Sequence, residues 1–183
     1  MRRLILLVAA MGCSRARILD TALTGRAARD SGEWVPDDTG EQPPPPDIVL
    51  NEVMADGSEA ADWLELVSLE PVPVDLSGWL LSDDWESEEE GWALPPGTVL
   101  DAGARLVVVA DDGQTSNTQL SASFKLAADG EVVTLVAPDA VVVDEVSYPP
   151  LEVDTAFARL PDGTGDWSVT EVPTKGSVNE VEE

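Results

Sequence analysis

The 183-residue sequence contains no histidine and only one cysteine, Cys13. Histidine is the commonest general base and the commonest ligand of transition metals, so its absence excludes every His-dependent catalytic triad. A single cysteine excludes an intramolecular disulfide, a zinc site built from several cysteines and an iron–sulfur cluster. We therefore expect a protein that is not an enzyme and that has no cofactor, unless a hard cation such as Ca²⁺ binds.

Basic residues are also scarce. Ten Lys and Arg stand against 36 Asp and Glu, which gives a formal net charge of −26. A protein that grips nucleic acid needs clustered Lys and Arg to neutralise phosphates, so no nucleic-acid partner is expected. Cations, basic proteins and uncharged polymers remain as partners. Hydrophobic residues make up 43% of the chain, which is enough to bury a core.

The apolar segment at the N-terminus is too short to span a bilayer, which takes about 20 apolar residues. Arg2 and Arg3 precede the apolar residues 4–10, as in a secretory signal peptide. Residues 10–13 (AMGC) resemble a bacterial lipobox, in which the cysteine is lipidated after cleavage, although Ala10 stands where the motif usually has Leu. The alternative is a plain secretory signal. We expect a signal peptide at residues 1–12 and a lipid bilayer bound through acylated Cys13.

Residues 13–46 carry little strand signal and are expected to form a flexible tether. The residue after the cysteine is Ser14 and not Asp, which in lipoproteins of this kind implies the bacterial outer membrane, with the domain facing the periplasm or the cell surface. Four consecutive prolines at residues 43–46 favour a stiff spacer of about 3.1 Å per residue. The folded domain is predicted at residues 47–180, with an acidic tail at 181–183.

Short apolar or alternating segments, separated by Gly, Pro and Asp, follow from Ile48 onward. Many are rich in valine, which favours strands over helices. Seven to nine strands at intervals of about a dozen residues predict an all-β sandwich or small barrel. The expected strands are residues 48–53, 63–67, 79–81, 105–110, 132–137 and 140–146, with shorter ones at 124–126 and 156–160.

Several motifs in a fixed order point to one family. They are IVLNEV (48–53), DWLEL (62–66), VDLSGWLLSD (74–83), LPPGTVLDAG (94–103), VDEVSY (143–148) and VPTKGSVN (172–179). This order resembles the lamin tail domain, an immunoglobulin-like β-sandwich, in its bacterial extracellular form. The resemblance covers nearly all of residues 47–179. Lys175 and Ser177 depart from it, because the family usually has Pro and Ala around the last Gly.

The resemblance assigns structural roles to several residues. It implies that Trp79 fills the core and that Gly78 allows the turn before it; Leu64 and Leu66 share one face of a strand. The family's known roles are non-catalytic: a part of filament proteins and an interaction module in animal nuclei, and a module of secreted and surface proteins in bacteria. We therefore expect a membrane-anchored binding or structural module that recognises an envelope protein or a glycan.

The acidic segment at residues 83–92 is the first candidate site, with six carboxylates in eight residues. Ca²⁺ takes six to eight oxygen ligands and would relieve their repulsion, so a calcium-dependent adhesion module is an alternative function. A solvated loop is the simpler interpretation. Trp85 and Trp92 flank the charges and could stack on sugars or anchor a protein. The candidate calcium ligands are Asp83, Asp84, Glu86 and Glu88.

A second group of acidic residues surrounds the first expected hairpin. It comprises Glu52, Asp56, Asp62 and Glu65, of which Glu52 and Glu65 are expected on neighbouring strands. Paired carboxylates are the catalytic groups of glycoside hydrolases, which makes a carboxylate-based hydrolase a further alternative. Calcium ligation is another. Turn and edge residues that prevent aggregation of strand edges are the interpretation we favour.

Overall fold

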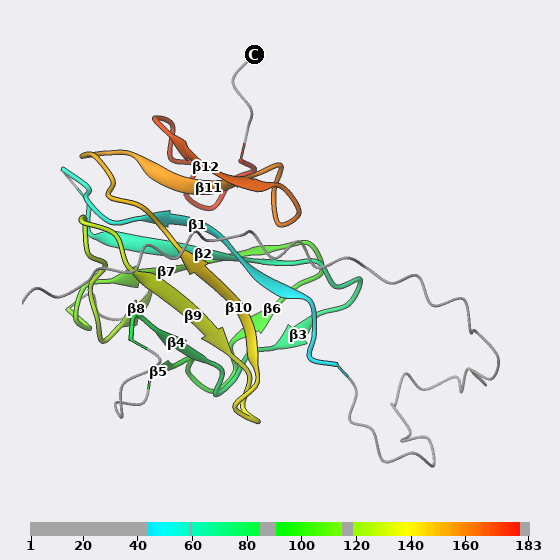
Figure 1. The fold of residues 1–183 in the computed structure, drawn as a ribbon. Coiled ribbons are helices and arrows are strands. Elements are labelled where there is room, and N and C mark those ends of the chain that lie inside the picture. The colour runs from blue at the N-terminus through cyan, green and yellow to red at the C-terminus, as the bar shows by residue number, and fades with distance from the viewer. Residues whose placement is uncertain (1–43, 59, 85–90, 115–118, 180–183) are drawn as a thin grey trace, which may run out of the picture. The chain divides into compact units, whose positions relative to one another are not determined.

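A computed structural model describes residues 44–58, 60–84, 91–114 and 119–179, and every described element is a β-strand (Figure 1). The predicted all-β class is confirmed. Among these residues no helix is long and apolar enough to cross a membrane. The strands are β1 (Ile48–Met54), β2 (Asp62–Ser68), β3 (Val74–Asp75), β4 (Leu80–Ser82), β5 (Trp92–Ala93), β6 (Val99–Leu100), β7 (Arg105–Ala110), β8 (Leu120–Ala122), β9 (Val132–Val136), β10 (Val142–Ser147), β11 (Ala156–Leu160) and β12 (Asp166–Thr170).

The strands form two main sheets and one short pair. The larger sheet has the order β12-β11-β1-β2-β7-β8, and the smaller has the order β10-β9-β4-β5. All pairs are antiparallel except β7 with β8, and β3 pairs with β6 as a separate two-stranded sheet. Figure 1 shows the four-stranded sheet lying across the strands of the six-stranded one. The described residues thus form a β-sandwich.

The core lies between the two sheets, and strand alternation selects its residues. Leu64 and Leu66 of β2 are fully buried in one hydrophobic cluster with Leu135 of β9, because every second side chain of a strand points to the same face. The register of β1 against β2 shifts between Leu50 and Glu52. This bulge places both Leu50 and Val53 in the core cluster, although an odd number of positions separates them.

The turn before β4 brings a tryptophan into this core. Gly78 has a backbone φ of +76°, a conformation that residues with a Cβ atom rarely adopt. The Trp79 amide donates a hydrogen bond to the Leu76 carbonyl at 3.1 Å and thereby closes the turn. The Trp79 side chain is 4% exposed and packs in the main cluster.

The expected strand at residues 124–126 is absent from the structure. Lys125 forms only an isolated bridge with Asp111, and the strand of this region is β8, which ends two residues before the expected one. The sequence did not predict strands β3, β5, β6, β8 and β12. Four of them have only two or three residues, too few to show an alternating pattern, so their pairing depends on neighbouring strands.

The six-stranded sheet is also covered on the face that points away from the core. All residues of β2 except Asp62 are buried, including Trp63, Glu65 and Val67 on this second face. Trp63 is 1% exposed and packs with Met54 and Ala156 in a separate small cluster. Residues 171–179, called the C-terminal strap below, donate hydrogen bonds to carboxylates of this face.

Candidate functional site

Two acidic residues lie opposite each other in the middle of the six-stranded sheet. Glu52 of β1 is the register partner of Glu65 on β2, and both are 0% exposed. The expectation that they lie on neighbouring strands agrees with this pairing, but their interpretation as turn or edge residues is wrong, because β1 and β2 are interior strands. Buried carboxylates are costly unless polar groups surround them, so their partners decide what the pair can do.

The C-terminal strap supplies partners to both carboxylates. Thr174 contacts both oxygens of Glu52: its amide lies 2.9 Å from Oε1 and its hydroxyl 2.9 Å from Oε2. The Gly176 amide donates to Oε2 of Glu65 at 2.7 Å. The two carboxyl groups therefore hold the strap on the sheet, and each of these contacts uses a different carboxyl oxygen.

Glu65 has two further partners within the sheet. The Asn51 side-chain amide donates to Oε1 at 2.9 Å, and Arg105 Nε lies 3.7 Å from the same oxygen. Arg105 also forms an ion pair with Asp162, which follows β11. Burial raises the pKa of Glu65, while the hydrogen bonds from Asn51 and Gly176 and the charge of Arg105 act in the opposite direction.

Burial also raises the pKa of Glu52, and the negative charge of Glu65 adds to this effect, whereas the hydrogen bond from the Thr174 amide opposes it. Raised pKa values of paired carboxylates are a feature of acid–base sites. A glycosidase pair, however, must flank a substrate, and both side chains here have no exposed surface and are bonded to the strap. The geometry supports a structural role for the pair.

The other two acidic residues of this group lie away from the pair. Asp62 begins β2, and burial raises its pKa, an effect opposed by hydrogen bonds from the backbone of Leu126 and Gly57. Asp56 lies in the connection between β1 and β2, where its charge contributes to the raised pKa of Asp62. Within the described ranges, no three Cys, Asp or Glu residues gather closely enough to hold a metal ion.

The acidic segment after β4 is described only at its two ends. Asp83 is half-buried, and Asp84 is exposed with its amide 3.1 Å from the Ser82 hydroxyl. Trp92 is half-buried in β5 opposite Leu81. Glu86, Glu88 and Trp85 lie outside the described residues, so the proposed calcium site and the paired tryptophans stay predictions.

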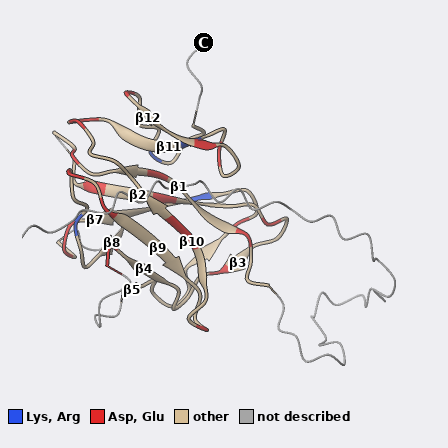
Figure 2. Cartoon of the chain, viewed as in Figure 1, with Lys and Arg blue, Asp and Glu red and all other residues tan. Residues whose placement is uncertain are grey.

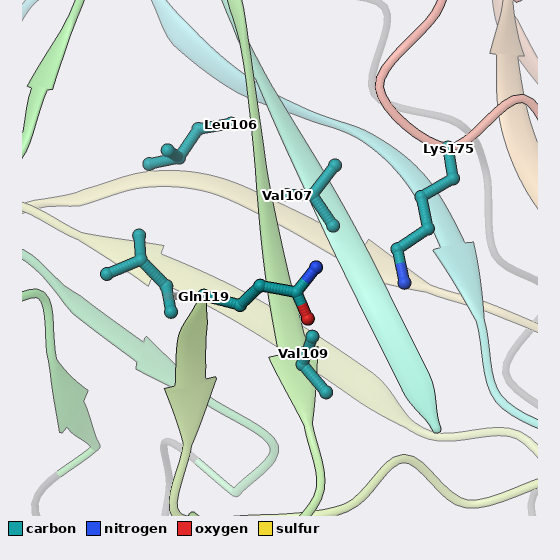
Figure 3. Close-up of a pocket in the computed structure, with 6 residues that line it drawn as sticks. Leu106, Val107, Val109, Gln119 and Lys175 are labelled. Atoms are coloured by element: carbon teal, nitrogen blue, oxygen red, sulfur yellow. The ribbon is translucent and has the colours of Figure 1, made fainter. Parts of the chain in front are cut away.

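A shallow cavity of about 430 Å³, which the sequence did not indicate, lies beside the strap (Figure 3). Lys175 borders it, and its ammonium lies 5.5 Å from the centre of the Trp63 ring, a cation–π distance. Burial lowers the pKa of Lys175. The cavity is lined by Leu106, Val107, Val109, Gln119, Leu120 and Lys175.

Comparison with protein families identifies the fold. A family model described as the lamin tail domain matches residues 41–150. The chain belongs to the lamin tail domain family. No curated protein sequence matches it. The predicted family and the immunoglobulin-like sandwich are thereby confirmed, and membership supports a binding or structural module without catalytic activity.

The lamin tail match ends before β11, yet the later residues complete the larger sheet. Strand β11 pairs with β1, and β12 pairs with β11. Arg159 of β11 donates to the Leu50 carbonyl at 2.9 Å and contacts Asp144 of β10 at 3.1 and 3.3 Å. Asp144 in turn accepts the Leu50 amide at 2.9 Å. In this lamin tail domain an ion pair therefore joins the two sheets at the bulge of β1.

Proposed function

We propose that this lamin tail domain is displayed on the bacterial outer membrane by acylated Cys13 and recognises a protein or glycan of the cell envelope. Family membership supports a binding or structural module. The anchor rests on residues 1–13, whose basic start, apolar segment and cysteine follow the lipoprotein pattern. Three acyl chains at about 0.8 kcal/mol per buried CH₂ would make the attachment nearly permanent.

The non-catalytic part of the proposal rests on the contacts that Glu52 and Glu65 make within the fold. Both are buried, and their oxygens contact groups of the strap and of neighbouring strands. The carboxylates that the sequence marked as a hydrolase pair thus contribute to the fold, and recognition falls to exposed surfaces.

Charge narrows the class of ligand. Figure 2 shows acidic residues on many strands and loops, with few basic ones among them. The whole chain has a net charge of −26. Opposite potentials favour association, whereas like charges oppose it. The proposal therefore favours a basic protein or an uncharged glycan over an anionic polymer.

Growth with labelled palmitate tests the anchor. The wild-type chain should take up label and sediment with membranes, and Cys13→Ala should do neither, because no other residue of the chain carries a thiol. Ser14→Ala is the matched control and should be labelled. Label on the Cys13→Ala variant, or none on the wild type, would contradict this part of the proposal.

Binding to isolated envelope polysaccharide and to envelope protein extracts separately tests recognition. Loss of an aromatic anchor at a binding surface should weaken binding by at least about tenfold. Trp92→Ala, alone and with Trp85→Ala, is compared with Trp92→Phe, which keeps an aromatic face. Val99→Ala is the control, since it trims an exposed side chain on β6. Unchanged binding by a folded double variant would remove the two tryptophans from the proposal.

A further inference from the structure

The Thr174 hydroxyl contacts two oxygen atoms, but its single proton can be donated to only one of them. The hydroxyl lies 2.9 Å from Glu52 Oε2 and 2.5 Å from Asn179 Oδ1. The amide orientation of Asn179 is fixed, because its nitrogen donates to the Arg159 carbonyl at 2.9 Å and to the Asn51 carbonyl at 3.3 Å. Asn179 Oδ1 can therefore only accept a hydrogen bond.

A proton count identifies the state of Glu52. Thr174 has one hydroxyl proton, and the short contact assigns it to Asn179 Oδ1. The contact between the Thr174 oxygen and Glu52 Oε2 then needs a proton from the carboxyl group. The other oxygen, Oε1, accepts the Thr174 amide in either state. A neutral glutamic acid satisfies every one of these contacts.

Glu65 has the opposite requirement. Both of its oxygens face donors: Asn51 and Arg105 at Oε1, and Gly176 at Oε2. Each oxygen already accepts a hydrogen bond from an N–H group, and the ionised carboxylate is the stronger acceptor of these bonds. All of these contacts are satisfied when Glu52 carries a proton and Glu65 carries the negative charge. Two like charges on facing strands would repel each other, so this division also removes a direct repulsion.

We propose that the proton on Glu52 fastens the C-terminal strap to the six-stranded sheet and that ionisation of Glu52 releases it, so the strap is a pH-sensitive element. The strap carries Lys175, which borders the cavity on β7 and lies over Trp63. Release would therefore reshape this cavity and uncover the second face of the sheet.

The charged groups around Glu52 agree with this assignment. Glu65 faces it from β2, Arg105 lies beside Glu65 and pairs with Asp162, and Lys175 lies over Trp63. The Arg159 guanidinium is turned to Asp144. Burial and the Glu65 charge raise the pKa of Glu52 above its unfolded value. A raised pKa gives stability that is complete below the unfolded value and is lost as pH rises through the folded one.

Two charge-matched variants of the full chain test the proposal. Glu52→Gln places an NH₂ where the acid proton lies, so the strap should stay closed and lose its pH dependence. Glu65→Gln forces an NH₂ against other donors and should loosen the strap at every pH. The readout is hydrogen exchange at the Thr174 and Gly176 amides, corrected for its intrinsic pH dependence. Above the pKa of Glu52, exchange should be about tenfold slower in Glu52→Gln than in wild type, the effect expected when one hydrogen bond to the strap is kept in the variant and lost in the wild type.

Carbon-detected NMR of the Glu52 carboxyl in the wild type provides a measurement that needs no variant. Titration clearly above the usual range of glutamate, coupled to faster exchange of the strap amides, supports the proposal. Titration at or below the usual value would overturn it, as would a Glu52→Gln strap that exchanges as fast as that of Glu65→Gln. Neither outcome depends on the ligand of the domain.

Discussion

Arg159 joins three parts of the sandwich, and its removal should be costly. Its guanidinium bonds the Leu50 carbonyl of β1, pairs with Asp144 of β10 and lies 4.8 Å from the centre of the Trp167 ring. Hydrogen bonds to charged groups contribute about 1.5–3 kcal/mol, and a cation–π contact about 0.5–1 kcal/mol. Since the side chains of the pair retain 19% and 17% exposure, we expect Arg159→Ala to lower the free energy of unfolding by about 3 kcal/mol, within the sum of these terms.

A double-mutant cycle in urea isolates the ion pair. Asp144→Asn keeps an oxygen that can accept the Leu50 amide but removes the charge that faces Arg159. The coupling energy between Arg159→Ala and Asp144→Asn should be about 1–2 kcal/mol. Arg159→Lys is the matched control. It keeps the positive charge but lacks the planar guanidinium that bonds both the Leu50 carbonyl and the Asp144 carboxylate.

The outcome that refutes this reasoning is a coupling energy near zero with an unchanged urea m-value. It would mean that solvent screens the pair and that any cost of Arg159→Ala comes from lost packing on Trp167. A Lys variant as stable as the wild type would likewise refute the role assigned to the planar guanidinium.

Three further predictions follow from single side chains. Leu66→Ala removes a fully buried side chain and should lower the free energy of unfolding by about 2–5 kcal/mol, measured by urea denaturation. Gly78→Ala places a Cβ at a φ of +76° and should cost about 1–2 kcal/mol in the same assay. The Ser77 hydroxyl and amide hold the pKa of Asp75 below its usual value. Ser77→Ala should raise that pKa in an NMR titration. The stability that ionised Asp75 contributes should then be lost at a higher pH when the solution is acidified.

The strands that the sequence predicts correctly carry their own pattern. In β2, leucines alternate with other residues, and the period of two is sufficient to place Leu64 and Leu66 on one face. The ordered motifs indicate the family in the same way, because each is a local run of residues. Strand β8 could not be predicted, because its three residues pair in parallel with β7 and have no pattern of their own.

The acidic pair shows where sequence reasoning failed. The sequence favours turn or edge positions for Glu52 and Glu65, because isolated carboxylates are rarely buried. Their burial depends on Thr174 and Gly176, which are 122 and 111 residues further along the chain. Alternation with Leu64 and Leu66 places Glu65 on the face that points away from the core, so the sequence gives no local sign of burial, and the donors are visible only when the strap is placed on the sheet.

The large negative charge of the chain offers a competing explanation for any loss of stability at high pH, since ionising acidic groups repel one another everywhere. Glu52→Gln and Glu65→Gln separate the two explanations. Each variant replaces one carboxyl group by an amide on neighbouring strands, so general repulsion predicts that both reduce the pH dependence to a similar extent. The proton count instead predicts opposite changes in the closure of the strap: Glu52→Gln keeps it closed above the pKa of Glu52, whereas Glu65→Gln loosens it at every pH, because only Glu52 has a partner that needs a donor. Slower exchange of the strap amides in Glu52→Gln and faster exchange in Glu65→Gln can therefore come only from the local contacts of the strap.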